Sequence, residues 1–86
     1  MGHYLAERYL SSRDEAAFSL DAQRLRAAAA QFESRLLETL YCADDETCFY
    51  LFESASREHV DRTGSAAGLD LDRILAVSSL DERAES

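Results

Sequence analysis

The sequence predicts one small α+β domain with the element order β-α-β-β-α-β. Its 86 residues are one domain's worth of chain, enough to bury roughly 60–65% of the unfolded surface around one modest core. Hydrophobic residues make up 47% of the chain, with three glycines and no proline, which favours a compact unit with short loops. Segments with strand period and segments with helix period follow one another. We therefore expect a single domain over residues 1–86, with an ordered core at about 3–80.

The first strand is predicted at residues 3–10, HYLAERYL. Alternate residues of a strand point to opposite faces of the sheet, and here both faces mix apolar with charged residues. Such a strand fits a sheet that helices cover on one side, while something other than bulk water covers the other side.

The first helix is predicted at about residues 13–33. Ser12 followed by Glu15 has the spacing of a capping box, in which two side chains satisfy free amides at a helix N-terminus. A start at Ser19 is the alternative. Apolar residues recur at steps of four and three, the period of a buried helix face: Phe18, Ala22, Leu25, Ala29 and Phe32.

A hairpin is predicted next. Two strand-length runs rich in Leu, Tyr and Phe lie at 35–42 and 47–54, and the acidic residues Asp44–Glu46 separate them. Aspartate suits a turn because its side chain accepts hydrogen bonds from nearby backbone amides.

The loop of this hairpin decides where the two cysteines lie. A three-residue loop places Cys42 directly opposite Cys48, whereas a two-residue turn places Tyr41 opposite Cys48 and sends the cysteines to opposite faces. Two thiols make neither a four-ligand zinc site nor a disulfide framework. We interpret both as structural residues that stay reduced.

The remaining chain predicts one short helix and one last strand. Ser56 is a plausible N-cap for a helix at about 57–67, and Gly68 suits the left-handed position that ends it. A strand is predicted at 72–80, followed by the charged tail 81–86.

This order is that of the split βαβ, or ferredoxin-like, fold. It predicts a four-stranded antiparallel sheet with two helices on one face. Right-handed crossovers place strands 3–10 and 47–54 at the centre, and we expect this central pair to run parallel. The open face would be apolar, so a homodimer packed sheet to sheet is expected. Depending on register, that face would carry some of Leu5, Tyr9, Leu40, Tyr50, Phe52 and Val77.

Composition narrows the classes of partner. The net charge of −8, from 17 acidic and nine basic residues, repels phosphate backbones and anionic lipid, which argues against nucleic-acid and membrane binding. The first residues, MGHYLAERYL, hold no apolar signal segment, and no run approaches the roughly 18–20 apolar residues of a membrane span. We expect a cytoplasmic protein.

Five residues are candidates for a functional site. Glu7 and Glu38 are carboxylates on neighbouring predicted strands, and they could act beside Tyr50 in a ligand cleft between sheet and helices. His59 and His3 are the two imidazoles, the side chains that nickel and zinc prefer. His59 is favoured as a metal ligand because a helix holds it. No residue is assigned a catalytic role.

The segments ERYL, RLRAAAA, DDETCFYLFES and AGLDLDRIL resemble a family of small bacterial proteins of unknown function, known as nickel-binding proteins after one member. The resemblance extends over about residues 3–80. It implies a ferredoxin-like, dimeric α+β-barrel fold and the binding of nickel or another divalent metal.

The sequence thus supports two functions. The first is a small cytoplasmic homodimeric binding protein, not an enzyme, that holds a divalent metal through His59 or His3, with ligands from both protomers. The alternative is a small-molecule-binding or catalytic dimeric α+β-barrel protein with an organic ligand in the cleft. An enclosed pocket above about 300 Å³ would favour the alternative.

Overall fold

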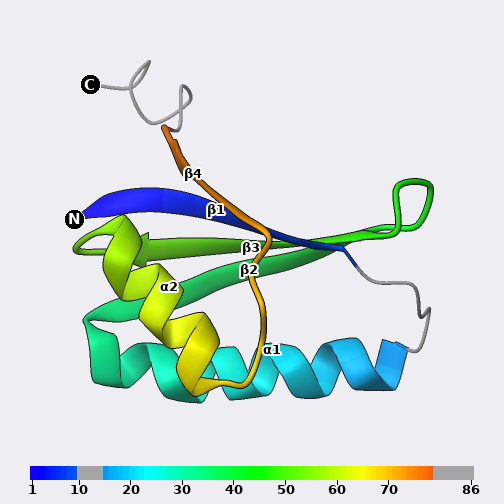
Figure 1. Cartoon of the computed structure of the whole chain (residues 1–86), viewed down its shortest axis with the longest axis horizontal. Helices are drawn as coiled ribbons and strands as arrows, with labels where there is room; N and C mark the ends of the chain where they lie inside the picture. Colours follow the sequence, from blue (N-terminus) through cyan, green and yellow to red (C-terminus); the bar gives the residue numbers. More distant parts are fainter. Residues whose placement is uncertain (10–14, 79–86) are drawn as a thin grey trace.

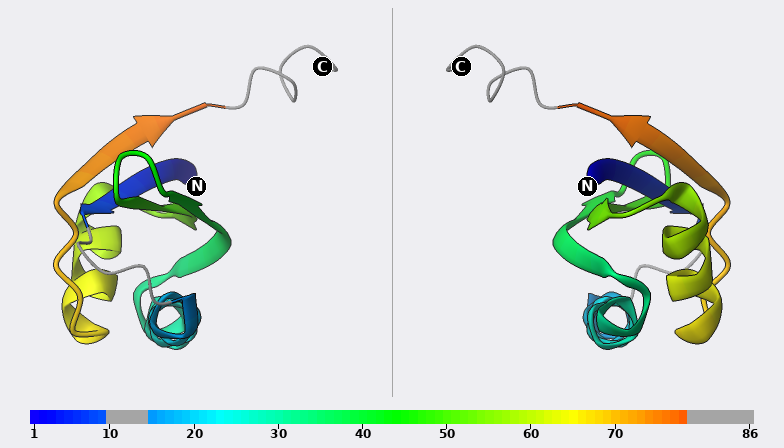
Figure 2. Two further views of the ribbon diagram at one scale, coloured as in Figure 1. Left: turned by 90° about the vertical axis from the view of Figure 1, so that its right-hand side faces the viewer. Right: turned by 90° about the vertical axis from the view of Figure 1, so that its left-hand side faces the viewer.

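The computed structural model describes residues 1–9 and 15–78 as two layers, a four-stranded sheet with both helices on one of its faces (Figure 1). The side views show the other face of the sheet uncovered by either helix (Figure 2). The elements are β1 (Gly2–Tyr9), α1 (Glu15–Ala29), the 3-10 turn η1 (Ala30–Phe32), β2 (Ser34–Cys42), β3 (Thr47–Ser54), α2 (Arg57–Ala66) and β4 (Arg73–Val77).

The strand order is β2-β3-β1-β4 and every neighbouring pair is antiparallel. The predicted ferredoxin-like α+β fold is therefore confirmed. The expectation that the two central strands, β1 and β3, run parallel is wrong. Each crossover through a helix skips one strand, so β1 is parallel to β2, and β3 lies between them antiparallel to both.

The predicted helices and strands differ from the observed ones mainly at their ends. Helix α1 is already formed at Glu15, so the alternative start at Ser19 is wrong, and it ends in η1 before Glu33, whose φ of 49° is left-handed. The capping box at Ser12 lies outside the described residues. Residues 79–80 of the predicted final strand and the predicted tail 81–86 also lie outside the described residues. Strand β4 itself ends at Val77.

The second helix begins where the sequence predicts. The Ser56 hydroxyl accepts the backbone N–H of His59 at 3.2 Å, which makes it the N-cap of α2. After the helix, Gly68 has a φ of 76°, the left-handed conformation that glycine adopts at least cost. None of the helices of the described residues is long and apolar enough to cross a membrane.

The core lies between the sheet and the helices, and the end of it away from the β2–β3 hairpin is apolar. Phe52 and Leu36 face each other across β3 and β2, and both are buried. The stripe predicted for α1 is largely confirmed, with Phe18, Leu25 and Ala29 buried. The buried cluster comprises Ala6, Leu25, Ala29, Leu36, Cys48, Tyr50, Phe52, Val60 and Leu69.

A β-bulge in β2 sets the rest of the inner face. The register with β3 shifts between Leu36 and Glu38. Beyond the shift, Thr39 pairs with Tyr50 and Tyr41 pairs with Cys48 on the side of the helices. Bulges redirect side chains in this way and often lie beside functional sites.

The hairpin loop has four residues, Ala43–Glu46, because Cys42 pairs with Thr47. Neither predicted loop length is right, but the alternative that places Tyr41 opposite Cys48 is confirmed. Cys42 and Cys48 therefore lie on opposite faces of the sheet, and both are free thiols.

The outer face of the sheet combines apolar side chains with charged ones, among them Glu7, Glu38 and Arg73. The side chains that alternate with the core residues form it, and of those predicted for it, Leu5, Tyr9, Leu40 and Val77 lie there. Tyr50 and Phe52 do not, because the register turns both toward the helices, where they are fully buried. Phe49, Leu51 and Leu75 complete the outer apolar surface.

Candidate functional site

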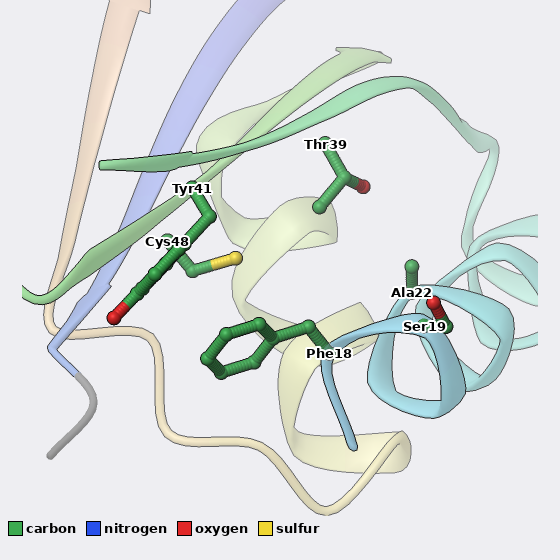
Figure 3. Close-up of a pocket in the computed structure, with 6 residues that line it drawn as sticks. All are labelled: Phe18, Ser19, Ala22, Thr39, Tyr41 and Cys48. Atoms are coloured by element: carbon green, nitrogen blue, oxygen red, sulfur yellow. The ribbon is translucent and has the colours of Figure 1, made fainter. Parts of the chain in front are cut away.

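A pocket of about 430 Å³ lies between the N-terminal half of α1 and the hairpin end of β2 and β3. In Figure 3 the strand side chains project toward those of the helix across this space. The pocket is open on one side and is lined by Phe18, Ser19 and Ala22 from α1 and by Thr39, Tyr41 and Cys48 from the strands.

Small side chains leave this space open. The helix presents Ser19 and Ala22 to the sheet here, and Thr39 is the residue that faces them from β2. Further along the helix, Leu25 is fully buried and Phe52 fills the same layer. The pocket therefore occupies the part of the core that the sequence does not fill with large side chains.

An aromatic pair forms one wall of the pocket. The ring centroids of Phe18 and Tyr41 are 4.5 Å apart and the ring planes are tilted by 36°. Aromatic pairs at this separation attract each other through dispersion and ring electrostatics, so the wall is held between helix and strand.

Three hydroxyl groups in and beside the pocket are buried without a hydrogen-bond partner among the described residues. They belong to Thr39, Tyr41 and Tyr50. The Tyr50 hydroxyl does have Arg8 and Cys48 as polar neighbours, but neither meets it with hydrogen-bond geometry. A buried hydroxyl without a partner costs about 1–3 kcal/mol, so such groups mark a place where water or a ligand binds.

A charged pair joins the sheet to α1 beside the pocket. The Nη1 of Arg8 lies 2.7 Å from Oδ2 of Asp21, and the side chains are 21% and 15% exposed. Burial by itself lowers the pKa of Arg8, but the hydrogen bond to Asp21 and the nearby Tyr50 hydroxyl outweigh it and raise the pKa. The guanidinium is therefore charged, and the carboxylate neutralises it locally.

The thiol and the phenol next to this pair stay protonated at neutral pH. Burial is the main cause that raises the pKa of Cys48, although Tyr50 and Arg8 oppose it. Burial likewise raises the pKa of Tyr50 far above its ordinary value. Both groups thus remain neutral donors, and neither is poised to act as a base or as a nucleophile.

The structure does not bring the three predicted ligand-binding residues together. Glu7 lies on the outer face, where its Oε2 is 3.8 Å from Nε of Arg73, and Glu38 is exposed on the same face. Tyr50 lies on the inner face beside the pocket. Only Tyr50 is thus placed near the cavity.

The two histidines also lie on opposite sides of the sheet. The Nε2 of His3, on the outer face, is 3.9 Å from Oε2 of Glu53. On α2, the Nδ1 of His59 is 2.6 Å from the Ser56 hydroxyl, and Thr63 donates to the His59 carbonyl. Within residues 1–9 and 15–78, no three His, Cys, Asp or Glu side chains group closely enough to hold a metal ion.

The pocket residues that sequence reasoning missed are Phe18, Ser19, Ala22 and Thr39. Two of these, Phe18 and Ala22, were assigned to the core stripe of the helix. The only signal for the pocket was the step from large to small residues along that stripe. The position of Thr39 depends on the bulge, for which the sequence has no marker.

The fold and pocket define a small ferredoxin-like α+β domain, and comparison with known proteins agrees with the fold. The crystal structure of SCO4226 from Streptomyces coelicolor A3(2) is similar to it, with a TM-score of 0.74, 20% sequence identity, and 90% of this chain and 96% of that chain covered. No family model and no curated protein matches the sequence.

Proposed function

We propose that the protein is a cytoplasmic homodimer that binds a small organic molecule in the pocket between α1 and the sheet. One observation carries the proposal: a space of about 430 Å³ has three buried hydroxyls in and beside it that lack a partner within residues 1–9 and 15–78. Pockets of about 300–1,000 Å³ with a few converging polar groups are the usual form of ligand sites. Binding is favoured over catalysis because the thiol and phenol there stay protonated.

Filling the pocket should abolish ligand binding. In Ala22→Phe the phenyl ring occupies the cavity, so fragments that shift the amide NMR signals of wild-type residues around Ala22 and Thr39 should no longer do so. Gln23→Phe adds the same ring to the exposed side of the helix and is the matched control. A fragment screen without hits at these residues, or equal binding by both variants, would count against the proposal.

The homodimer is proposed through the outer face of the sheet. Leu51 lies in the middle of that face, opposite Leu5 on one side and Glu38 on the other. An apolar sheet face on a small protein needs a cover, and a stable dimer buries upward of about 1,000 Å². We expect sedimentation equilibrium to give twice the chain mass of 9.6 kDa.

Leu51→Glu should convert the dimer to a monomer that retains its helix content, because it places a charge in the centre of the contact. Ser65→Glu, on the exposed part of α2, should stay dimeric. A wild-type mass of 9.6 kDa at micromolar concentration would refute the dimer.

A second candidate function is the binding of nickel or another divalent metal at the dimer interface. The observation that favours it is the His3–Glu53 pair on the outer face, an imidazole and a carboxylate 3.9 Å apart. The described residues of one chain supply these two ligands at that place, so a complete site needs further ligands, which the partner would supply. His59, the ligand that the sequence favours, keeps only its Nε2 free of the Ser56 hydroxyl.

Calorimetric titration with nickel distinguishes these possibilities. We expect His3→Ala to remove any heat of nickel binding and His59→Ala to preserve it. The reverse result would move the metal site to α2. Wild-type protein that releases no heat would leave small-molecule binding as the function.

A further inference from the structure

We propose that the pocket selects a neutral aromatic molecule that carries a hydroxyl or carbonyl group, the class to which phenols belong. This inference rests on the proposed small-molecule function and specifies its ligand. Three features of the pocket lead to it: the shape of its walls, the hydrogen-bonding groups left without partners, and the balance of charge.

The walls fit a flat ring. Phe18 and Tyr41 supply aromatic surface, with ring centroids 4.5 Å apart, and Ala22 and Ser19 supply small side chains on the helix across from the strands. A planar aromatic ligand can lie against such rings with little loss of conformational freedom.

The hydrogen-bonding groups require polar atoms on that ring. Thr39 and Tyr41 line the pocket, but their hydroxyl oxygens are closed off by neighbouring atoms and have no partner among the described residues, so a ligand meets them only after a side-chain rotation exposes them. A hydroxyl both donates and accepts, so a phenol or a carbonyl satisfies it, whereas a pure hydrocarbon leaves it unpaired at a cost. Polar groups left unpaired by the wrong ligand are the strongest source of selectivity in such sites.

The charge balance excludes ions from the pocket. The six lining residues that the structure describes are all neutral. The neighbouring cation, Arg8, already pairs with Asp21 at 2.7 Å, so an anionic ligand would gain little from it. The net charge of −8 also disfavours anions at a distance. A cationic ligand would meet no carboxylate among the lining residues that the structure describes, and an isolated charge in a partly buried site loses hydration without compensation.

Three probes of one ring size test the class: 2-naphthol, 2-naphthoate and naphthalene, titrated into the full-length protein at pH 7 and followed by tyrosine fluorescence and amide NMR. We expect 2-naphthol to bind at least about fivefold to tenfold more tightly than either of the others, the effect of one or two net hydrogen bonds. Thr39→Val and Tyr41→Phe should remove this advantage while leaving the affinity for naphthalene unchanged.

A readout of the free protein separates a ligand-binding role from a structural one. Because the two hydroxyls have no partner in the described part of the chain, neither variant should lower the midpoint of thermal unfolding. A lowered midpoint would show that the hydroxyls serve the fold and would overturn the inference. Naphthoate binding as tightly as naphthol, or an advantage of naphthol that survives both substitutions, would overturn the ligand class but leave pocket binding intact. If none of the three probes binds and the fragment screen also gives no hits, the proposed function itself is refuted.

Discussion

Replacing Phe52 with alanine should cost about 3–5 kcal/mol of folding stability, the range measured for buried Phe-to-Ala changes. Phe52 is fully buried on β3, between Tyr4 of β1 and Leu36 of β2. The substitution removes a ring from the closely packed half of the core, where neighbouring side chains cannot close the gap. The total free energy of unfolding of a small domain is about 5–15 kcal/mol. The variant should therefore unfold at a much lower urea concentration, as followed by circular dichroism.

Phe49→Ala is the matched control, because Phe49 has the same side chain on the same strand but lies on the outer face and is only partly buried. Its effect should act through the proposed dimer, so the loss of stability should depend on protein concentration, whereas that of Phe52→Ala should not. Equal losses at every concentration would contradict the assignment of the two faces.

The helices could be predicted because their signals are local. The stripe that contains Leu25 and Ala29 repeats over several turns, and only a helix turns those residues to one side. Ser56 caps α2 with its own side chain, within three residues of its partner. Neither inference depends on how distant segments pair.

The faces of the strands could not be predicted because they depend on pairing. In the run RLLETL, Leu36 and Leu37 are both apolar, and either could face the core. The bulge resolves this in favour of Leu36 and then turns Thr39 inward and Glu38 outward. No residue type marks a bulge of this kind, and one extra residue reverses every face beyond it.

The relative positions of the candidate ligand-binding residues could not be predicted for the same reason. Glu7, Glu38 and Tyr50 were grouped by strand proximity, but the register pairs Glu7 with Phe49 and Tyr50 with Ala6 and Thr39. The pairing of Tyr50 with Thr39 belongs to the register that sequence reasoning left open as one of two alternatives, and the pairing of β1 with β3 has no local signal in the sequence. The tyrosine was therefore the one member that could reach the inner pocket.

Breaking the Arg8–Asp21 pair should have the next largest effect on stability. The pair joins β1 to α1 with a 2.7 Å contact between Nη1 and Oδ2. Among the described residues, the other ion pairs lie within the sheet or within α1, so this pair alone links the helix layer to the sheet. Both side chains are mostly buried, so in Arg8→Met the carboxylate of Asp21 loses its partner in a place that water reaches poorly. Because some exposure remains, we expect a loss of about 1–2 kcal/mol, less than for a fully buried pair.

Arg24→Met is the control for this prediction. Arg24 also approaches Asp21, at 4.0 Å from Oδ1, but its side chain is 56% exposed, and such surface pairs contribute little. The double variant Arg8→Met/Asp21→Leu should recover part of the loss, since it removes the stranded carboxylate along with its partner, and the cycle of single and double variants gives the coupling directly. If Arg8→Met and Arg24→Met lower the urea midpoint equally, then the pair does not hold α1 over the pocket, and the packing of Phe18 against Tyr41 must do so alone.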